Sequence, residues 1–217
     1  MWAILAKGGV IMIPIALLSV VGLAVVIEKA LSLRQSRVLL PEIINTIDQI
    51  QSPADVPMAI RTCERYDAPF ANIIRSGLEE VGEPIAMVRQ AMEDTGRREV
   101  KRLERFMVVL ETVAAASPLL GLLGTVFGMI DVFSVISVQG VGQTGRLAGG
   151  IAQALITTAT GLSIGIPALV LYNFFDARVE GYIVKIDTYA HRLLKQIALL
   201  NSGGVDQPDI TRRRDNI

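Results

Sequence analysis

The chain has 217 residues, of which 51% are hydrophobic and 19% charged, and its formal net charge at pH 7 is zero. This charge balance, with a pI of about 6.6, gives no electrostatic reason to expect a nucleic-acid partner. The single cysteine, Cys63, excludes an internal disulfide and a cysteine-rich metal site, and we expect it to be a buried apolar residue.

The apolar residues are concentrated in three blocks rather than spread as in a soluble core. Residues 8–27, 112–130 and 147–175 contain no Asp, Glu, Lys or Arg. A helix of about 20 apolar residues crosses a hydrocarbon layer of about 30 Å. Because no water is available there to bond the backbone, helix is the expected conformation. The sequence therefore predicts an all-α membrane protein with three transmembrane helices.

Residues 1–28 predict a first transmembrane helix that is retained. Their apolar part is too long for the core of a signal peptide, and no small-residue cleavage pattern follows it. Lys29, Arg34 and Arg37 come next, and the positive-inside rule places them in the cytoplasm. The N-terminus is then expected outside.

Residues 29–105 predict a cytoplasmic helical segment without a sheet, since no stretch alternates with period two. One helical stripe is formed by Leu39, Ile43, Ile44, Ile47 and Ile50, and prolines at 53, 57 and 69 divide the segment. Pro84 suits the start of a longer helix. A basic cluster precedes the second block, and we interpret it as a solvated face beside anionic headgroups rather than a specific lipid site: Arg97, Arg98, Lys101, Arg102 and Arg105.

The second and third transmembrane helices are expected at 106–137 and 149–176, joined by a periplasmic loop at 138–148. With no strong breaker after Pro84, the second helix is predicted to be continuous from there to about Ile136 and to extend far into the cytoplasm. The third is predicted to continue as a cytoplasmic amphipathic helix at 177–200, with the stripe Val179, Ile183, Ile186, Leu193 and Ile197. Residues 201–217 are polar and predict a disordered, C-terminal cytoplasmic tail.

Two of the blocks contain hydroxyls, glycines and prolines where a plain anchor would carry only aliphatic residues. Small residues at helical spacing allow close packing in a bilayer, and these are Gly121, Gly124, Gly128, Gly161 and Gly165, with Pro118 and Pro167 nearby. Candidates for a polar pathway or for packing are the hydroxyls and the amide of these blocks: Ser117, Thr125, Gln153, Thr157, Thr158 and Thr160. The simpler interpretation of each threonine is a bond to the carbonyl four residues earlier in its own helix.

Hydroxyls can line a water file or coordinate a cation, but moving protons by a binding step needs a carboxylate or imidazole. None lies at mid-depth, since Glu111 and Asp131 are expected near opposite interfaces and His191 on the exposed face of the cytoplasmic helix. If the spans form a proton path, a second polypeptide must supply the titrating group. Three helices cannot surround a pore alone, so copies of this chain or a partner must close the polar face, and a homo-oligomer is the more economical of the two. No nucleophile, metal-ligand or phosphate-loop motif appears in the spans, which predicts no enzyme activity, catalytic residue, metal or cofactor.

Two segments carry a family resemblance. Ser117–Val126 (SPLLGLLGTV), followed by Gly128-Met129-Ile130 and Phe133, resembles the second-helix signature of the ExbB/TolQ/MotA proton-channel family. Gly150-Ile151-Ala152, Ala154-Leu155, Thr158-Ala159, Gly161-Leu162, Ile166-Pro167-Ala168 and Tyr172-Asn173 resemble its third helix. The short head and compact cytoplasmic part are similar to the ExbB/TolQ branch.

The resemblance implies a homopentamer in the bacterial inner membrane around a dimer of single-span, ExbD- or TolR-like partners. The partner's membrane aspartate would carry the proton and would lie opposite Thr125 and Thr158. The work would reach the outer membrane through a TonB- or TolA-like protein, for transport or envelope maintenance. Relatives usually carry Glu where this chain has Gln153, which cannot hold a charge. The extra hydroxyls of Thr157 and Thr160 leave sodium coupling open.

Two alternatives to an ion-driven motor or channel subunit follow from the same residues. A membrane scaffold would use the small residues for packing alone, and an intramembrane enzyme would need a reactive cluster that the spans lack. The sequence does not distinguish TonB-dependent uptake from the Tol–Pal system or another envelope or motility pathway.

Overall fold

The computed structural model describes residues 9–34, 38–50, 52–140 and 144–203. The described elements are the helices α2 (Met12–Ser32), α4 (Pro41–Gln49), α5 (Val56–Glu64), α6 (Pro69–Glu79), α7 (Ile85–Glu104), α8 (Met107–Gln139) and α9 (Thr144–Gly203), and the 3-10 turn η2 (Pro53–Asp55). Within these ranges no strand forms, and only an isolated bridge joins Val81 and Glu83. The predicted all-α class is confirmed, with three helical runs long and apolar enough to cross a membrane.

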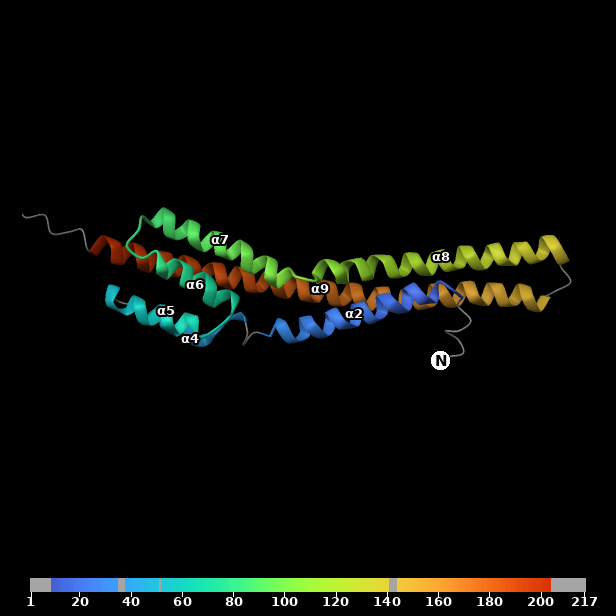
Figure 1. Cartoon of the computed structure of the whole chain (residues 1–217), viewed down its shortest axis with the longest axis horizontal. Helices are drawn as coiled ribbons and strands as arrows, with labels where there is room; N and C mark the ends of the chain where they lie inside the picture. Colours follow the sequence, from blue (N-terminus) through green and yellow to red (C-terminus); the bar gives the residue numbers. More distant parts are fainter. Residues whose placement is uncertain (1–8, 35–37, 51, 141–143, 204–217) are drawn as a thin grey trace, which may run out of the picture. The chain divides into compact units, whose positions relative to one another are not determined.

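The chain divides into two compact units. Unit 1 comprises residues 1–32 and 104–178, and unit 2 comprises residues 33–103 and 179–217, so α9 contributes to both. In unit 1, α8 and the first part of α9 run side by side as an antiparallel hairpin, with α2 alongside them (Figure 1). Unit 1 therefore holds all three apolar runs.

The helix predicted to be continuous from Pro84 to Ile136 is interrupted at Arg105 and Phe106. Phe106 adopts a left-handed backbone conformation with φ 67°, and α8 begins at the next residue. Such a conformation costs a non-glycine residue about 1–2 kcal/mol. The guanidinium carbon of Arg105 lies 4.6 Å from the centroid of the Phe106 ring, so the two residues at the interruption form a cation–π contact.

Unit 2 is built from short helices whose starts follow the prolines. Pro41, Pro57 and Pro69 occupy the first turns of α4, α5 and α6, where the missing N–H costs nothing. The predicted stripes form its core: Ile43, Ile47, Val179, Leu193 and Ile197 are each at most 2% exposed. Cys63 is 1% exposed, as predicted, and burial raises the pKa of its thiol to about 11.

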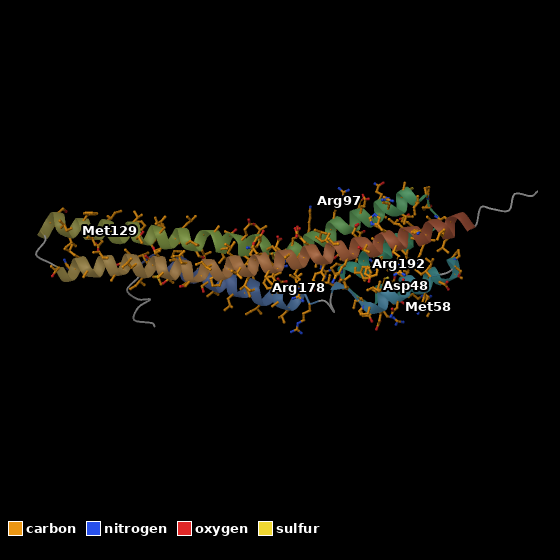
Figure 2. The ribbon with its side chains drawn as sticks, turned by 180° about the vertical axis from the view of Figure 1, so that it is seen from behind. Asp48, Met58, Arg97, Met129, Arg178 and Arg192 are labelled. Atoms are coloured by element: carbon orange, nitrogen blue, oxygen red, sulfur yellow. The ribbon has the colours of Figure 1, made fainter. Side chains whose placement is uncertain are left out.

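Ion pairs at the surface of unit 2 join residues of different helices and loops. Arg192 of α9 lies 3.1 Å from Asp48 of α4 (Figure 2). The guanidinium of Arg102 donates two hydrogen bonds to the carboxylate of Asp67, at 2.8 and 2.7 Å. Arg102 of the predicted basic cluster pairs with Asp67 at the surface and stays about half exposed, and the interpretation of the cluster as a face beside anionic headgroups stays a prediction. These bonds hold the pKa of Asp67 below its usual value.

Candidate functional site

A single seam of small residues joins α8 to α9 in unit 1. The residues that meet there recur at intervals of three or four: Ala114, Ser117, Gly121, Gly124 and Gly128 on α8, and Gly150, Ala154, Thr157, Gly161 and Gly165 on α9. Intervals of three and four residues are close to one helical turn, so each helix keeps one face against the other along the seam.

The two backbones approach so closely along the seam that side chains cannot be added. A Cβ on Gly161 would lie 2.5 Å from the carbonyl oxygen of Ser117 and 3.0 Å from the Cα of Gly121. A Cβ on Gly165 would lie 2.6 Å from the ring of Pro118. Small residues permit this contact in a bilayer, where dispersion between helices replaces the hydrophobic effect. Pro167, in contrast, is exposed.

Two of the candidate hydroxyls lie inside the seam and are fully buried. Thr157 donates to the carbonyl of Ala154 at 2.8 Å, and its side chain fills the space left by Gly124. Ser117 donates to the carbonyl of Val113 at 2.7 Å. Both hydroxyls bond their own helices, as the simpler interpretation predicts. A second polypeptide has no access to either hydroxyl in this hairpin.

Thr158 is different because its hydroxyl crosses to the other helix. It donates to the carbonyl of Gly121 on α8 at 3.1 Å, and the residue is only partly buried. In a regular helix this carbonyl also accepts the N–H of residue i+4, which here is Thr125. Thr125 is partly exposed as well, and its hydroxyl donates to Leu122 at 2.6 Å. The two threonines therefore share one side of the hairpin, which we call the open flank.

The first helix, α2, covers the opposite side. A Cβ on Gly22 would lie 3.0 Å from Val113 of α8, and a Cβ on Gly9 would lie 3.3 Å from the amide carbon of Gln153 on α9. Val113 and Thr125 are 12 residues apart, so they lie about 120° apart around α8. Gln153 and Thr158 lie about 140° apart around α9 by the same count. Thr160 follows Gln153 by two turns and donates to its own helix at Ile156.

The open flank extends to Asp176, which the sequence analysis did not single out. Asp176 follows Thr158 by 18 residues, which is five full turns, so the two share a face of α9. Glu111 precedes Thr125 by 14 residues, about four turns of α8, so the two lie on nearly the same face of that helix. The 18-residue spacing is a signal that could have identified Asp176. The flank therefore carries hydroxyls in its middle and acidic groups at one end.

The described ranges hold no group of three or more His, Cys, Asp and Glu residues that could bind a metal ion. His191 is exposed, as predicted, with its Nδ1 atom 3.3 Å from a carboxylate oxygen of Asp187. Glu111 and Asp131 are also exposed. Neither apolar block of the α8–α9 hairpin contains a titrating carboxylate or imidazole.

The fold and this hairpin define a multi-span, all-helical membrane protein with a close-packed helix pair. Residues 65–188, more than half of the chain, match the MotA/TolQ/ExbB proton channel family, and the chain belongs to that family. The resemblance predicted from the two helix signatures is confirmed.

Relatives carry names from both systems that the resemblance suggested. An ExbB homolog for biopolymer transport from Methanothermobacter thermautotrophicus is 33% identical over 83% of this chain and 64% of its own length. A biopolymer transport ExbB-like protein from Synechocystis is 29% identical over 77% of this chain and 81% of its own. The Tol-Pal system protein TolQ of Pseudomonas aeruginosa is 36% identical over 57% of this chain and 58% of its own. The chain spans less than two thirds of the first and third of these relatives.

Proposed function

We propose that this chain is a subunit of an ion-driven channel or motor of the ExbB/TolQ kind in the bacterial inner membrane. It would couple the proton motive force, through a single-span ExbD- or TolR-like dimer, to a TonB- or TolA-like protein. The work would serve outer-membrane transport or envelope maintenance. The chain would assemble as a homopentamer, with its N-terminus in the periplasm and its C-terminus in the cytoplasm.

The observation that carries the proposal is the open flank. Thr125 and Thr158 lie there together, away from α2, in blocks that contain no carboxylate or imidazole. Hydroxyls that are partly exposed on one flank can bond an acidic side chain, but they cannot bind and release a proton themselves near neutral pH. The acidic group must then come from another chain, and copies of the hairpin would enclose it.

Reconstitution tests this proposal. The chain and a single-span partner with one membrane aspartate are placed in proteoliposomes, and ion transfer is followed with a pH-sensitive dye under an imposed potential. We expect Thr125→Val and Thr158→Val to abolish partner-dependent transfer, because valine keeps the shape and loses the hydroxyl. Thr160→Val is the matched control, since its hydroxyl lies on the side of Gln153 and bonds its own helix.

Two further experiments distinguish proton from sodium coupling and an ion pathway from a packing scaffold. Transfer that persists in sodium-free buffer supports proton coupling, whereas strict dependence on sodium would show that the proton assignment is wrong. If both threonine variants transfer ions fully while Gly124→Leu prevents assembly, the hairpin is a packing scaffold and the pathway assignment fails.

A further inference from the structure

Gln153 is the one amide among the pathway candidates, and its contact lies with α2. Gly9 has φ +70°, and a Cβ built on it would clash with the amide nitrogen Nε2 of Gln153 and lie 3.3 Å from the amide carbon. The carboxamide of Gln153 thus occupies the space that a side chain at Gly9 would need. Residues with positive φ are normally glycine, so the backbone favours glycine at this position, and a Cβ would in addition force the end of the Gln153 side chain to shift.

Gly9 belongs to the turn from which α2 starts. Its carbonyl accepts the N–H of Met12, the first residue of α2, at 3.1 Å, and the carbonyl of Val10 accepts the N–H of Ile13 at 3.2 Å. A side chain packed on this turn fixes where α2 begins along α9. The second contact of α2, between Gly22 and Val113, lies on the other helix of the hairpin. Together the two contacts hold α2 over one flank.

We infer that Gln153 is a positioning residue that fixes the start of α2 on the hairpin, and that its side chain is not part of the ion pathway. The position around α9 supports this, because Gln153 and Thr158 lie on opposite sides of the seam, about 140° apart. An amide serves this contact as well as a carboxylate does, since packing against a backbone turn requires no charge. The second half of the inference rests on the proposed function, whereas the first half does not.

A double-mutant cycle tests the contact. Gly9→Ala introduces backbone strain and a clash with the carboxamide, whereas in a Gln153→Ala background only the strain remains. We expect Gly9→Ala to lower the thermal midpoint in detergent by about 2–4 °C more in the native background than with Gln153→Ala. Non-additivity of this kind is the mark of residues in contact. The matched control is Gly9→Ala with Thr160→Ala, which we expect to be additive because Thr160 lies two turns away.

Ion transfer tests the second half of the inference, because a change in packing alone would not alter the rate of transfer. Gln153→Met keeps the length of the side chain without the amide, and we expect partner-dependent transfer in proteoliposomes to stay within about twofold of the native chain, a change of less than half a kcal/mol. Gln153→Glu should do the same and should keep the coupling to Gly9.

The outcomes separate the two proposals. An additive cycle for Gly9 and Gln153 would overturn the contact, and loss of transfer in Gln153→Met at an unchanged thermal midpoint would overturn its exclusion from the pathway. If Thr158→Val also transfers ions normally, the proposed pathway fails, but a non-additive cycle still establishes Gln153 as the residue that positions α2.

Discussion

The hydroxyl of Thr158 donates a hydrogen bond to the backbone carbonyl of Gly121, at 3.1 Å, and so joins the two helices of the hairpin directly. The approach is possible because Gly121 has no side chain: a Cβ there would lie 3.1 Å from the Cα of Thr158. Interhelical bonds of this type contribute about 0.6 kcal/mol on average in a membrane protein, with a maximum of about 1.7. The bond therefore contributes modestly to stability, and it lies on the open flank of the hairpin.

From this bond we predict that Thr158→Val lowers the stability of the hairpin by about 0.5–1.5 kcal/mol, whereas Thr158→Ser leaves it nearly unchanged. Serine keeps the donor, and valine keeps the shape without it. Thermal unfolding in detergent measures the difference. A valine variant as stable as the native chain would mean that the bond contributes nothing.

Close packing at the seam gives a sharper prediction. Gly161→Ala places a methyl group 2.5 Å from the carbonyl oxygen of Ser117, a backbone atom that cannot move aside. We expect a loss of at least about 1–3 kcal/mol, the usual cost of over-packing, and weakened assembly. Gly149→Ala is the control on the same helix, since a Cβ there meets nothing within 4 Å. Equal effects of the two changes on thermal unfolding would contradict the close contact of α8 and α9 at Gly161.

The pair formed by Asp67 and Arg102 predicts a pH dependence in unit 2. The two hydrogen bonds from Arg102 hold the pKa of Asp67 below its ordinary value of 3.8. The pair therefore stabilises the folded chain above that value, and the stabilisation is lost as pH falls through the lowered pKa. Because the side chains are 76% and 49% exposed, we expect Asp67→Asn to cost less than about 1 kcal/mol.

Unfolding measured at pH 7 and again below pH 3 checks this sign. The native chain and Asp67→Asn should differ at the higher pH and converge at the lower one. A difference that grows as the pH falls would show that the carboxylate is not stabilised by Arg102.

Cys63 should resist thiol reagents in the folded chain. Its side chain is buried, and burial raises its pKa to about 11, so the reactive thiolate is scarce at pH 8. We expect alkylation at pH 8 to be slow in the native state and rapid in denaturant, as followed by mass spectrometry. Rapid labelling of the folded protein would place Cys63 at the surface instead.

The sequence predicted the helical class, the apolar runs and the stripes of unit 2, because periodicity and hydropathy are local signals. It did not predict the interruption at Phe106, since no glycine or proline marks it. The proline positions were informative because the cost of a missing N–H depends only on place within a helix.

The sequence predicted which residues belong to the candidate site, but not how they are arranged around the two helices. The sequence grouped Thr125, Thr157, Thr158 and Thr160 as polar residues of the spans, and spacing alone could not sort them. Their sorting depends on which flank α2 covers, and that is decided by contacts such as those of Gly9 and Gly22. Thr157 is buried in the seam because Gly124 makes room for it, a relation between two helices that no single-helix pattern contains.

The most direct test of the proposed pathway is the structure of the chain assembled with the single-span partner that we propose. We predict that the side chains of Thr125 and Thr158 line the centre of the assembly, within hydrogen-bond distance of the partner's membrane carboxylate in at least one copy. If both threonines instead contact lipid, or if no partner helix lies on the open flank, the proposed ion pathway is wrong.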